Sequence, residues 1–253
     1  MKIGFCAKLD KLQTVEEAGF AYIEPSVTSV LDMDDAGFAQ AKAALEHASI
    51  PASSFNVLFP KQMQLFACSE EELRTYLEKA FSRVQELGGR TVVFGSGKSR
   101  MRPEGMPYGE AFRKLCDITR VIGDVAEKYG ITLVVEPLNT SETNMINSVA
   151  EGADLVAAVH HPAVKLLADY YHIAVEHDRP GDLERLGGIA HAHIATEIGR
   201  RIPLVRDDGY LQMFAAMKHT GYEGNISIEG KSDNLLEDGL PAIAMLTALW
   251  EEA

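Results

Sequence analysis

The sequence predicts an α/β fold, a single (β/α)8 TIM barrel, and three observations support this prediction. Short apolar runs alternate with amphipathic segments at intervals of about thirty residues, which is the pattern of repeated βα units. The chain has 253 residues, close to the usual size of one such barrel. No linker rich in proline, glycine or serine divides the sequence. We therefore expect residues 1–253 to form one domain.

The first half of the chain contains four apolar runs that we interpret as strands, at residues 2–7, 22–27, 52–58 and 91–94. Helices are expected at residues 9–18, 38–48 and 69–87. The last of these helices has the clearest boundaries. Ser69 is a favourable first residue, three glutamates in the first turn suit a helix N-terminus, and Gly88 is a favourable stop.

The second half continues the same alternation. Strands are expected at residues 131–135, 164–168, 190–195 and 225–228, and helices at residues 110–129, 148–159, 211–220 and 241–250, with a short one at 182–186. His191 and His193 are two positions apart in one strand, so they should share a face. Eight strands and seven or eight helices complete the predicted barrel.

Composition limits the classes of function. The formal net charge is −13 and the pI is near 5.1, which disfavours nucleic-acid binding because such proteins usually present a basic surface. No apolar run approaches the roughly 18 residues of a membrane span, and the N-terminus lacks a signal peptide's apolar core. We expect a cytoplasmic protein that binds no membrane. Three dispersed cysteines argue against disulfides, although Cys6, at a strand end, could line a pocket.

Residues 95–109 form a long expected loop after the strand at 91–94. The loop holds the only basic cluster of an acidic sequence, made of Lys98, Arg100, Arg102 and, on its far side, Arg113. Its GSGKS segment suggests a phosphate-binding P-loop, but that motif requires a glycine where the chain has Val92, so we reject it. Two interpretations stay open: a solvated surface loop, or a loop at a strand's carboxyl end that meets an anionic substrate group such as phosphate.

Residues able to bind a metal stand at or near the ends of the last four expected strands: Glu136, Asp169, His193 and Glu229. All strands of a parallel barrel end on the same face, so these four should converge. Three carboxylates and one imidazole would repel one another without a cation, whereas a divalent ion leaves about one net negative charge. This donor set favours Mn²⁺ first, then Co²⁺ or Mg²⁺, with Zn²⁺ also compatible. We expect no thiolate near it.

Each of the four also has an ordinary structural explanation. Glu136 could be a surface residue at a strand end, and Asp169 could cap a turn. His193 could be a core histidine bonded to the backbone, and Glu229 could be a loop charge. Their joint position at four successive strand ends favours the metal site.

The segments EPLNTSETNMIN, ADYYHI, HAHIA and SIEG, in this order, resemble the motifs of the xylose-isomerase-like sugar isomerase and epimerase superfamily. The resemblance is strongest to ketose 3-epimerases of the D-tagatose 3-epimerase kind and to hydroxypyruvate isomerases. It covers about residues 90–230 by motif and the whole chain by strand count. It implies that Glu136, Asp169, His193 and Glu229 hold the metal, and that Glu136 and Glu229 also form an acid/base pair on opposite faces of the substrate.

The same resemblance implies three substrate-binding residues. Glu142 and His172 match residues that hold the substrate's hydroxyls and carbonyl, and Arg200 matches an arginine that orients the substrate. The chain departs from the family's pattern here, because it lacks the glycine-glutamate pair that follows the histidine equivalent to His193. Arg201 therefore stays an alternative to Arg200.

These observations predict a metal-dependent isomerase or epimerase of a small ketose or ketose phosphate, working through proton abstraction and an enediolate. Epimerisation, aldose–ketose isomerisation and dehydration of a keto-inositol begin with the same step, and the sequence leaves all three open. Two other classes remain: an endonuclease IV-like phosphodiesterase, which needs more histidines for its three zinc ions, and a non-catalytic sugar-binding protein. Relatives often form homodimers or homotetramers, and the sequence leaves the oligomeric state open.

Overall fold

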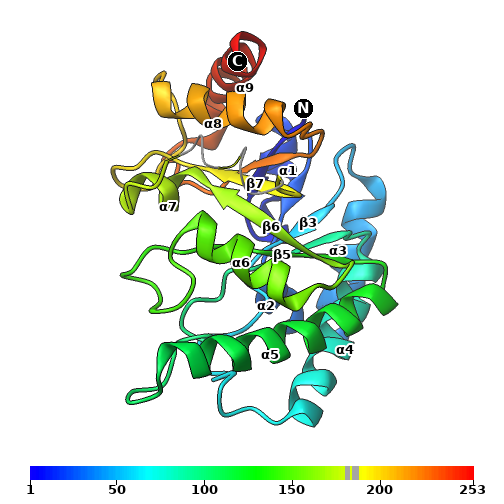
Figure 1. Ribbon diagram of the computed structural model, residues 1–253. Coiled ribbons are helices and arrows are strands. Elements are labelled where there is room, and N and C mark those ends of the chain that lie inside the picture. The colour runs from blue at the N-terminus through cyan, green and yellow to red at the C-terminus, as the bar shows by residue number, and fades with distance from the viewer. Residues whose placement is uncertain (180–182, 184–187) are drawn as a thin grey trace.

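Eight parallel strands form the centre of the computed structural model, which describes residues 1–179, 183 and 188–253 (Figure 1). The strands are β1 (Ile3–Cys6), β2 (Ile23–Glu24), β3 (Ser54–Phe55), β4 (Thr91–Phe94), β5 (Thr132–Val135), β6 (Val164–Asp169), β7 (His191–Ile194) and β8 (Ile226–Ile228). They are short apolar runs rich in β-branched residues, which suits strands that are covered on both faces.

The strands close into a barrel. Their hydrogen-bonded order is β2-β1-β8-β7-β6-β5-β4-β3. The remaining seam, between β2 and β3, is joined just beyond the strands: the backbone N–H of Val27 donates to Asn56 O at 2.8 Å, and that of Asn56 donates to Pro25 O at 3.0 Å. The predicted (β/α)8 TIM barrel is therefore confirmed.

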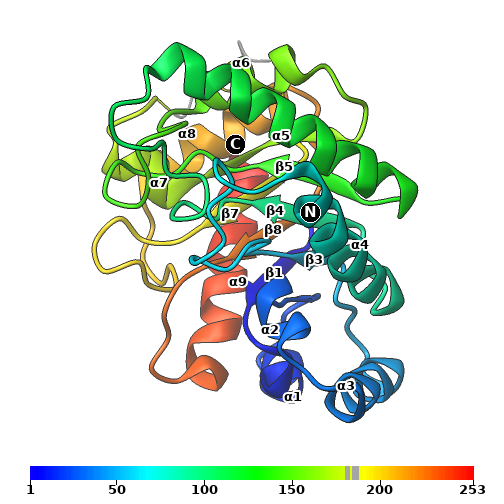
Figure 2. The same ribbon diagram turned by 90° about the horizontal axis from the view of Figure 1, so that it is seen from below.

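Helices cover the outside of the barrel. They are η1 (Leu9–Lys11), α1 (Leu12–Glu17), α2 (Val27–Leu31), α3 (Asp35–His47), α4 (Glu70–Glu86), α5 (Tyr108–Lys128), α6 (Val149–Val159), α7 (Tyr170–Val175), α8 (Asp208–His219) and α9 (Leu235–Glu252). Helices α5 and α6 lie on one side of the strands and α1 and α3 on the opposite side (Figure 2). No helix in the described part of the chain has the length and apolar character needed to cross a membrane.

The expected boundaries of α4, residues 69–87, hold to within one residue at each end. At the start of α4, Ser69 Oγ accepts from the N–H of Glu72 at 3.2 Å, and the Glu72 carboxylate accepts from the N–H of Ser69 at 2.9 Å. This reciprocal pair fixes the helix start. The start expected for the last helix was wrong, because α9 begins six residues earlier and contains Pro241, an exposed residue, in its second turn.

Other differences lie where strands end. The strand expected at 22–27 ends at Glu24, because Pro25 has no N–H to donate and Ser26 instead caps α2, its Oγ accepting from Ser29 N–H at 3.3 Å. The strand expected at 52–58 is reduced to β3. Helices α2 and α7 were not expected. The short helix predicted at 182–186 lies, apart from Leu183, outside the described residues.

The barrel interior is apolar in one half and polar in the other. Val93, Val134 and Leu167, from β4, β5 and β6, are fully buried and pack together. In the half formed by β2, β7 and β8, the buried side chains include Glu24, two histidines and Ser227. Buried polar groups of this kind are normally hydrogen-bonded to one another, and their partners lead to the site described next.

Candidate functional site

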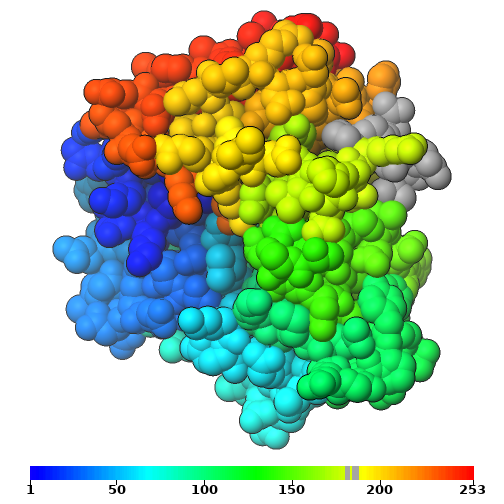
Figure 3. All heavy atoms as spheres, turned by 90° about the vertical axis from the view of Figure 1, so that its left-hand side faces the viewer, coloured from blue at the N-terminus to red at the C-terminus, as the bar shows by residue number. Residues whose placement is uncertain are grey.

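The carboxyl ends of the last four strands bring together the four residues expected at a metal site. Glu136 follows β5, Asp169 ends β6, His193 lies in β7 and Glu229 follows β8. Each offers an oxygen or nitrogen atom, and these atoms all lie within 4.8 Å of one another. On this face of the molecule, blue, green and yellow segments of the chain meet around a hollow (Figure 3). We call these four residues the acidic cluster.

His193 makes the closest contacts within the acidic cluster. Its Nδ1 lies 3.2 Å from Glu136 Oε1 and 3.2 Å from Glu229 Oε2. Glu136, Asp169 and His193 are buried, and Glu229 is half-buried. Glu136 fits because Gly95 follows β4: a Cβ at that position would lie 2.1 Å from Glu136 Oε2. A residue with a side chain there would displace the carboxylate.

The acidic cluster places several carboxylates in a buried position, where their negative charges are poorly solvated and repel one another. Burial raises the pKa of Glu136 more than the hydrogen bond to His193 lowers it. The pKa of Asp169 is also raised, because its burial outweighs the nearby positive charges. At Glu229, His193 and Arg200 outweigh burial and lower the pKa to about 2. A bound cation relieves this kind of crowding.

Arg200 supplies one positive charge to the acidic cluster. Its Nη2 donates to Glu229 Oε2 at 2.6 Å and to Asp169 Oδ2 at 3.4 Å. The guanidinium lies 4.5 Å from the centre of the Tyr171 ring, a stacking contact that arginine favours. Arg201, the alternative, instead forms an ion pair at the surface. Of these two arginines, Arg200 is the one that reaches the cluster.

Glu142 and His172 lie outside the acidic cluster, where Glu142 contacts Arg200 and His172 contacts Asp169. Glu142 Oε1 accepts from Arg200 Nη1 at 3.2 Å. His172 Nδ1 accepts from the backbone N–H of Asn139 at 3.0 Å, which places the imidazole proton on Nε2. That Nε2 lies 3.6 Å from Asp169 Oδ2 and has no hydrogen-bond partner among the described residues. It is a buried donor that a ligand oxygen could satisfy.

Glu24 is a site residue that the sequence analysis missed. Its Oε1 accepts from His193 Nε2 at 2.8 Å and its Oε2 from His191 Nε2 at 2.8 Å. The two histidines, expected on one face, thus share one buried carboxylate, and they outweigh its burial and hold its pKa well below the usual value. Because Nε2 of His193 donates to Glu24, its Nδ1 is the nitrogen available to an ion. A signal was present, since a proline follows Glu24 as it follows Glu136.

Arg100, in the basic loop, is fully buried, so a solvated surface position is wrong for this residue. Its Nη1 donates to Phe94 O at 2.8 Å and its Nη2 to Glu136 O at 2.6 Å. The guanidinium therefore ties the end of β4 to the end of β5, where Glu136 stands. Burial lowers its pKa to about 10, which leaves it charged at neutral pH. Lys98, in the same loop, is exposed.

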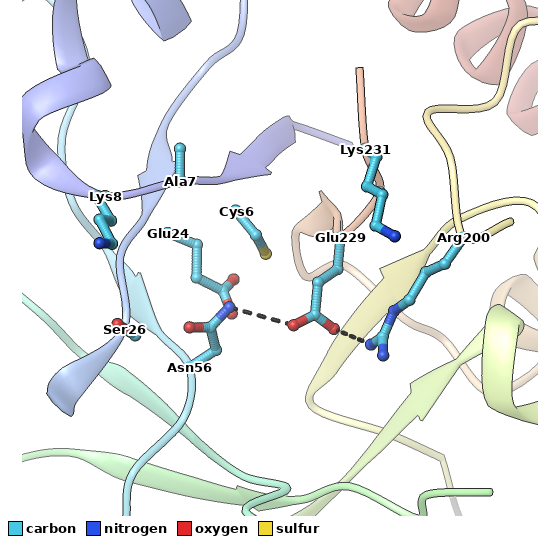
Figure 4. A pocket seen from close by; sticks show the side chains of 10 residues that line it. Cys6, Ala7, Lys8, Glu24, Ser26, Asn56, Arg200, Glu229 and Lys231 are labelled. Atoms are coloured by element: carbon cyan, nitrogen blue, oxygen red, sulfur yellow. Dashed lines mark hydrogen bonds and ion pairs between the residues drawn. The ribbon is translucent and has the colours of Figure 1, made fainter. Parts of the chain in front are cut away.

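Two adjoining cavities, each of about 300 Å³, open beside the acidic cluster and share Asn56, Arg200 and Glu229 as lining residues. The first cavity is also lined by Cys6, Lys8, Glu24, Ser26 and Lys231 (Figure 4). The second cavity is also lined by Phe59, Lys61, Lys98, Glu136, Leu138 and Glu142. Asn56 was not expected; its Nδ2 lies 3.4 Å from Glu229 Oε1.

Cys6 lines the first cavity, as its place at a strand end suggested. Its sulfur lies within 4.8 Å of an atom of Glu24 and of His193 that could bind a metal. A thiol therefore lies beside the acidic cluster, where no thiolate was expected. Burial and the nearby Glu24 raise the pKa of the thiol, so Cys6 stays protonated at neutral pH and is a poor ligand beside the carboxylates.

A β/α barrel with three carboxylates and an imidazole gathered at the carboxyl ends of its strands defines a class of protein suited to binding a divalent ion and a small polar ligand. Within this class, the chain belongs to the xylose isomerase-like TIM barrel family, whose sequence profile matches residues 12–249. The superfamily recognised from the motifs is confirmed.

Curated relatives are sugar epimerases by name. A D-psicose 3-epimerase from Ruminiclostridium cellulolyticum is 32% identical over 111 residues, which cover 44% of this chain and only 38% of that relative. A D-psicose 3-epimerase from Agrobacterium fabrum is 26% identical over 230 residues, covering 86% of this chain and 77% of the relative. These names confirm the expected class of enzyme, a sugar isomerase or epimerase.

Solved structures share the fold. A D-psicose 3-epimerase crystallised in the presence of D-fructose has a TM-score of 0.86 at 21% identity, covering 99% of each chain. The IOLI protein with a bound zinc atom has a TM-score of 0.76 at 17% identity, covering 100% of this chain and 99% of the other. At these identities the likeness shows the barrel, and the chemistry of this chain has to come from its own residues.

Proposed function

We propose that the protein is a metal-dependent epimerase of a small ketose. One observation carries the proposal: three carboxylates and a histidine converge beside the two cavities, with Glu136 and Glu229 each 3.2 Å from Nδ1 of His193. The epimerases among the relatives support the same type of reaction.

The acidic cluster would hold the ion. Mn²⁺ is the first candidate, followed by Co²⁺, Mg²⁺ or Zn²⁺, because carboxylate oxygens dominate the donor set. The zinc atom of the IOLI structure supports a divalent ion in this fold. When bound, the ion would act as a Lewis acid that stabilises negative charge on two neighbouring substrate oxygens. Three carboxylates, Arg200 and a divalent ion sum to a neutral site, which removes the crowding described above.

Glu136 and Glu229 would transfer the protons. One carboxylate removes the proton next to the ketone, and the other returns a proton to the opposite face of the planar enediolate, which inverts that carbon. Their surroundings differ, because burial raises the pKa of Glu136 whereas His193 and Arg200 outweigh burial at Glu229 and lower its pKa. Environments that separate two carboxyl pKa values are typical of acid/base pairs.

Glu142, His172 and Arg200 would bind the substrate's oxygens. The unpartnered Nε2–H of His172 can donate to a carbonyl or hydroxyl oxygen. The carboxylate of Glu142 lines the second cavity beside Glu136 and can accept from a hydroxyl. Arg200 contacts Glu142 and Glu229 at once, so it can orient both the ligand and the proton-transferring carboxylate.

A panel of ketoses and ketose phosphates, incubated with the Mn²⁺-loaded protein in D₂O, tests the proposal. The expected result is deuterium at the carbon next to the carbonyl, together with inversion of its hydroxyl. An aldose product, or loss of water from a keto-inositol, would assign another reaction to the same site. Sugar binding without deuterium uptake would indicate a non-catalytic sugar-binding protein.

Replacing Glu24 by glutamine is expected to weaken Mn²⁺ binding about 10- to 100-fold. The variant lacks the carboxylate that accepts from Nε2 of both His191 and His193, so Nδ1 of His193 is no longer held free for the ion. The dissociation constant of Mn²⁺, measured by electron paramagnetic resonance, checks this. Glu46→Gln, at an exposed position of α3, is the control. Wild-type affinity in Glu24→Gln would show that Glu24 does not act through His193.

A further inference from the structure

We propose that the ketose carries a terminal phosphate and that Lys8 and Lys231 bind this phosphate from two sides of the first cavity. The inference rests on the proposed function, because it names the substrate class of the same site. It starts from two cations placed beside the acidic cluster that no part of the epimerisation described above uses.

Lys8 and Lys231 reach the first cavity from loops that are far apart in the sequence. Lys8 follows β1, and Lys231 lies two residues beyond Glu229. They stand on two sides of the cavity, with Cys6 and Glu229 between them (Figure 4). Within the described parts of the chain, neither ammonium group has a hydrogen-bond or ion-pair partner. Both charges are therefore available to a ligand.

The residues that line the two cavities carry a net positive charge, whereas the whole chain is negative. The cations are Lys8, Lys61, Lys98, Arg200 and Lys231, and the anions are Glu24, Glu136, Glu142 and Glu229. Five cations against four anions give an excess of one positive charge, in a chain whose net charge is −13. A divalent ion, counted together with Asp169, raises the excess to two. A cleft of this sign attracts an anionic ligand, and a neutral ketose has no need of it.

The second cavity is less suited to the phosphate. It contains Glu136 and Glu142, which are assigned to the reacting end of the sugar, and both would repel an anion. Its lysines, Lys61 and Lys98, also line a neighbouring pocket with Gln64 and Met101. Both are exposed, as are Lys8 and Lys231, so the carboxylates are what distinguish the two cavities.

The first cavity offers the contacts that a phosphate needs. Its one carboxylate besides Glu229 is Glu24, which is already bonded to two histidines. Ser26 Oγ accepts from Ser29 N–H, so the Ser26 hydroxyl proton is available to a phosphate oxygen. Lys8 and Lys231 stand on two sides of the cavity, and their side chains are long and flexible, so both ammonium groups can turn toward a phosphate held between them.

Three probes that differ only at carbon 6 test the inference: D-fructose, D-fructose 6-phosphate and D-fructuronate. In the Mn²⁺ enzyme, the ratio of kcat/KM for the phosphate to that for D-fructose is expected to exceed one. Substituting both Lys8→Ala and Lys231→Ala is expected to lower this ratio about 100-fold, or about tenfold for each ammonium group removed. The matched control is Lys79→Ala with Lys165→Ala, two exposed lysines away from the cavities, in which the ratio should equal that of the wild type.

Binding of the same probes, measured by isothermal titration calorimetry, separates this inference from the proposed function. Turnover of D-fructose with no preference for its phosphate would overturn the inference and leave the epimerase proposal intact. If no sugar turns over, the epimerase proposal fails, and weaker binding of D-fructose 6-phosphate by the Lys8/Lys231 variant would still support the phosphate site.

Three results would overturn the phosphate site: an unchanged ratio and unchanged binding in the Lys8/Lys231 variant, a larger loss on substituting Lys61 and Lys98, or a preference for D-fructuronate. The second would move the anion to the second cavity. The third would show that a carboxylate is the group recognised.

Discussion

Glu229→Gln is expected to lower kcat for epimerisation about 10³-fold while the chain stays folded. Glutamine has nearly the same shape and can still contact Arg200, which lies 2.6 Å from the glutamate oxygen, but an amide neither removes nor returns a proton. Glu229 is half-buried at a strand end, so the substitution leaves the packed core untouched. Steady-state rates and the thermal unfolding midpoint, measured together, check both halves of the prediction.

Two measurements separate proton transfer from metal binding in this variant. Saturating Mn²⁺ compensates for a weakened ligand, so any loss of kcat that persists there belongs to the proton transfer. In D₂O, the remaining carboxylate, Glu136, can still exchange the proton of the epimer whose C–H bond faces Glu136. Exchange without inversion is therefore the expected signature. The control is Glu237→Gln, at an exposed position of α9. A wild-type kcat in Glu229→Gln would remove Glu229 from the acid/base pair.

The convergence of Glu136, Asp169, His193 and Glu229 was predictable because it follows from topology alone. Successive strands of a parallel barrel end on one face, so residues at successive strand ends meet whatever the loops do. The apolar runs located the last four strands to within one or two residues. That accuracy was sufficient to place all four side chains.

The parts of the site that were missed depend on three-dimensional contacts between distant segments. Glu24 pairs with His193, 169 positions away in the sequence, and no local pattern reports that distance. Arg100 looked like one of several loop cations, but its guanidinium satisfies two strand-end carbonyls in the protein interior. Cys6 reaches the site because β1 lies between β2 and β8 in the barrel. Strand spacing predicts which face a side chain joins, and tertiary packing decides what it meets there.

The neighbouring residues Arg200 and Arg201 show the same limit of prediction from sequence. They are adjacent in the sequence and equally charged, so composition could not separate them. The backbone of Arg200 adopts a left-handed conformation with φ of 48°, which costs energy for a residue with a side chain. That conformation accompanies a side chain directed at Glu229 and Asp169, while the side chain of Arg201 is at the surface.

Removal of the divalent ion is expected to lower turnover to less than about a thousandth, since Lewis-acid stabilisation of the developing charge accounts for several kcal/mol of the barrier. The chain should stay folded without the ion, because Arg200 and His193 already offset part of the negative charge of the acidic cluster. Adding Mn²⁺ after chelation should restore the rate. Full activity in a thoroughly chelated sample would rule out the proposed function.

Binding of Mn²⁺ should also raise the thermal stability of the folded chain. Mn²⁺ at about 100 times its dissociation constant stabilises the folded chain by about 2.7 kcal/mol, provided that it binds only that state. For a chain of this size, that corresponds to a rise of about 5–10 °C in the unfolding midpoint. Asp169→Asn removes a proposed ligand but neither of the carboxylates proposed to transfer protons, so its midpoint should rise only at higher Mn²⁺ and its rate should recover over the same range. If the rate and the midpoint responded to different concentrations of Mn²⁺, the ion bound by the acidic cluster would not be the one that supports catalysis.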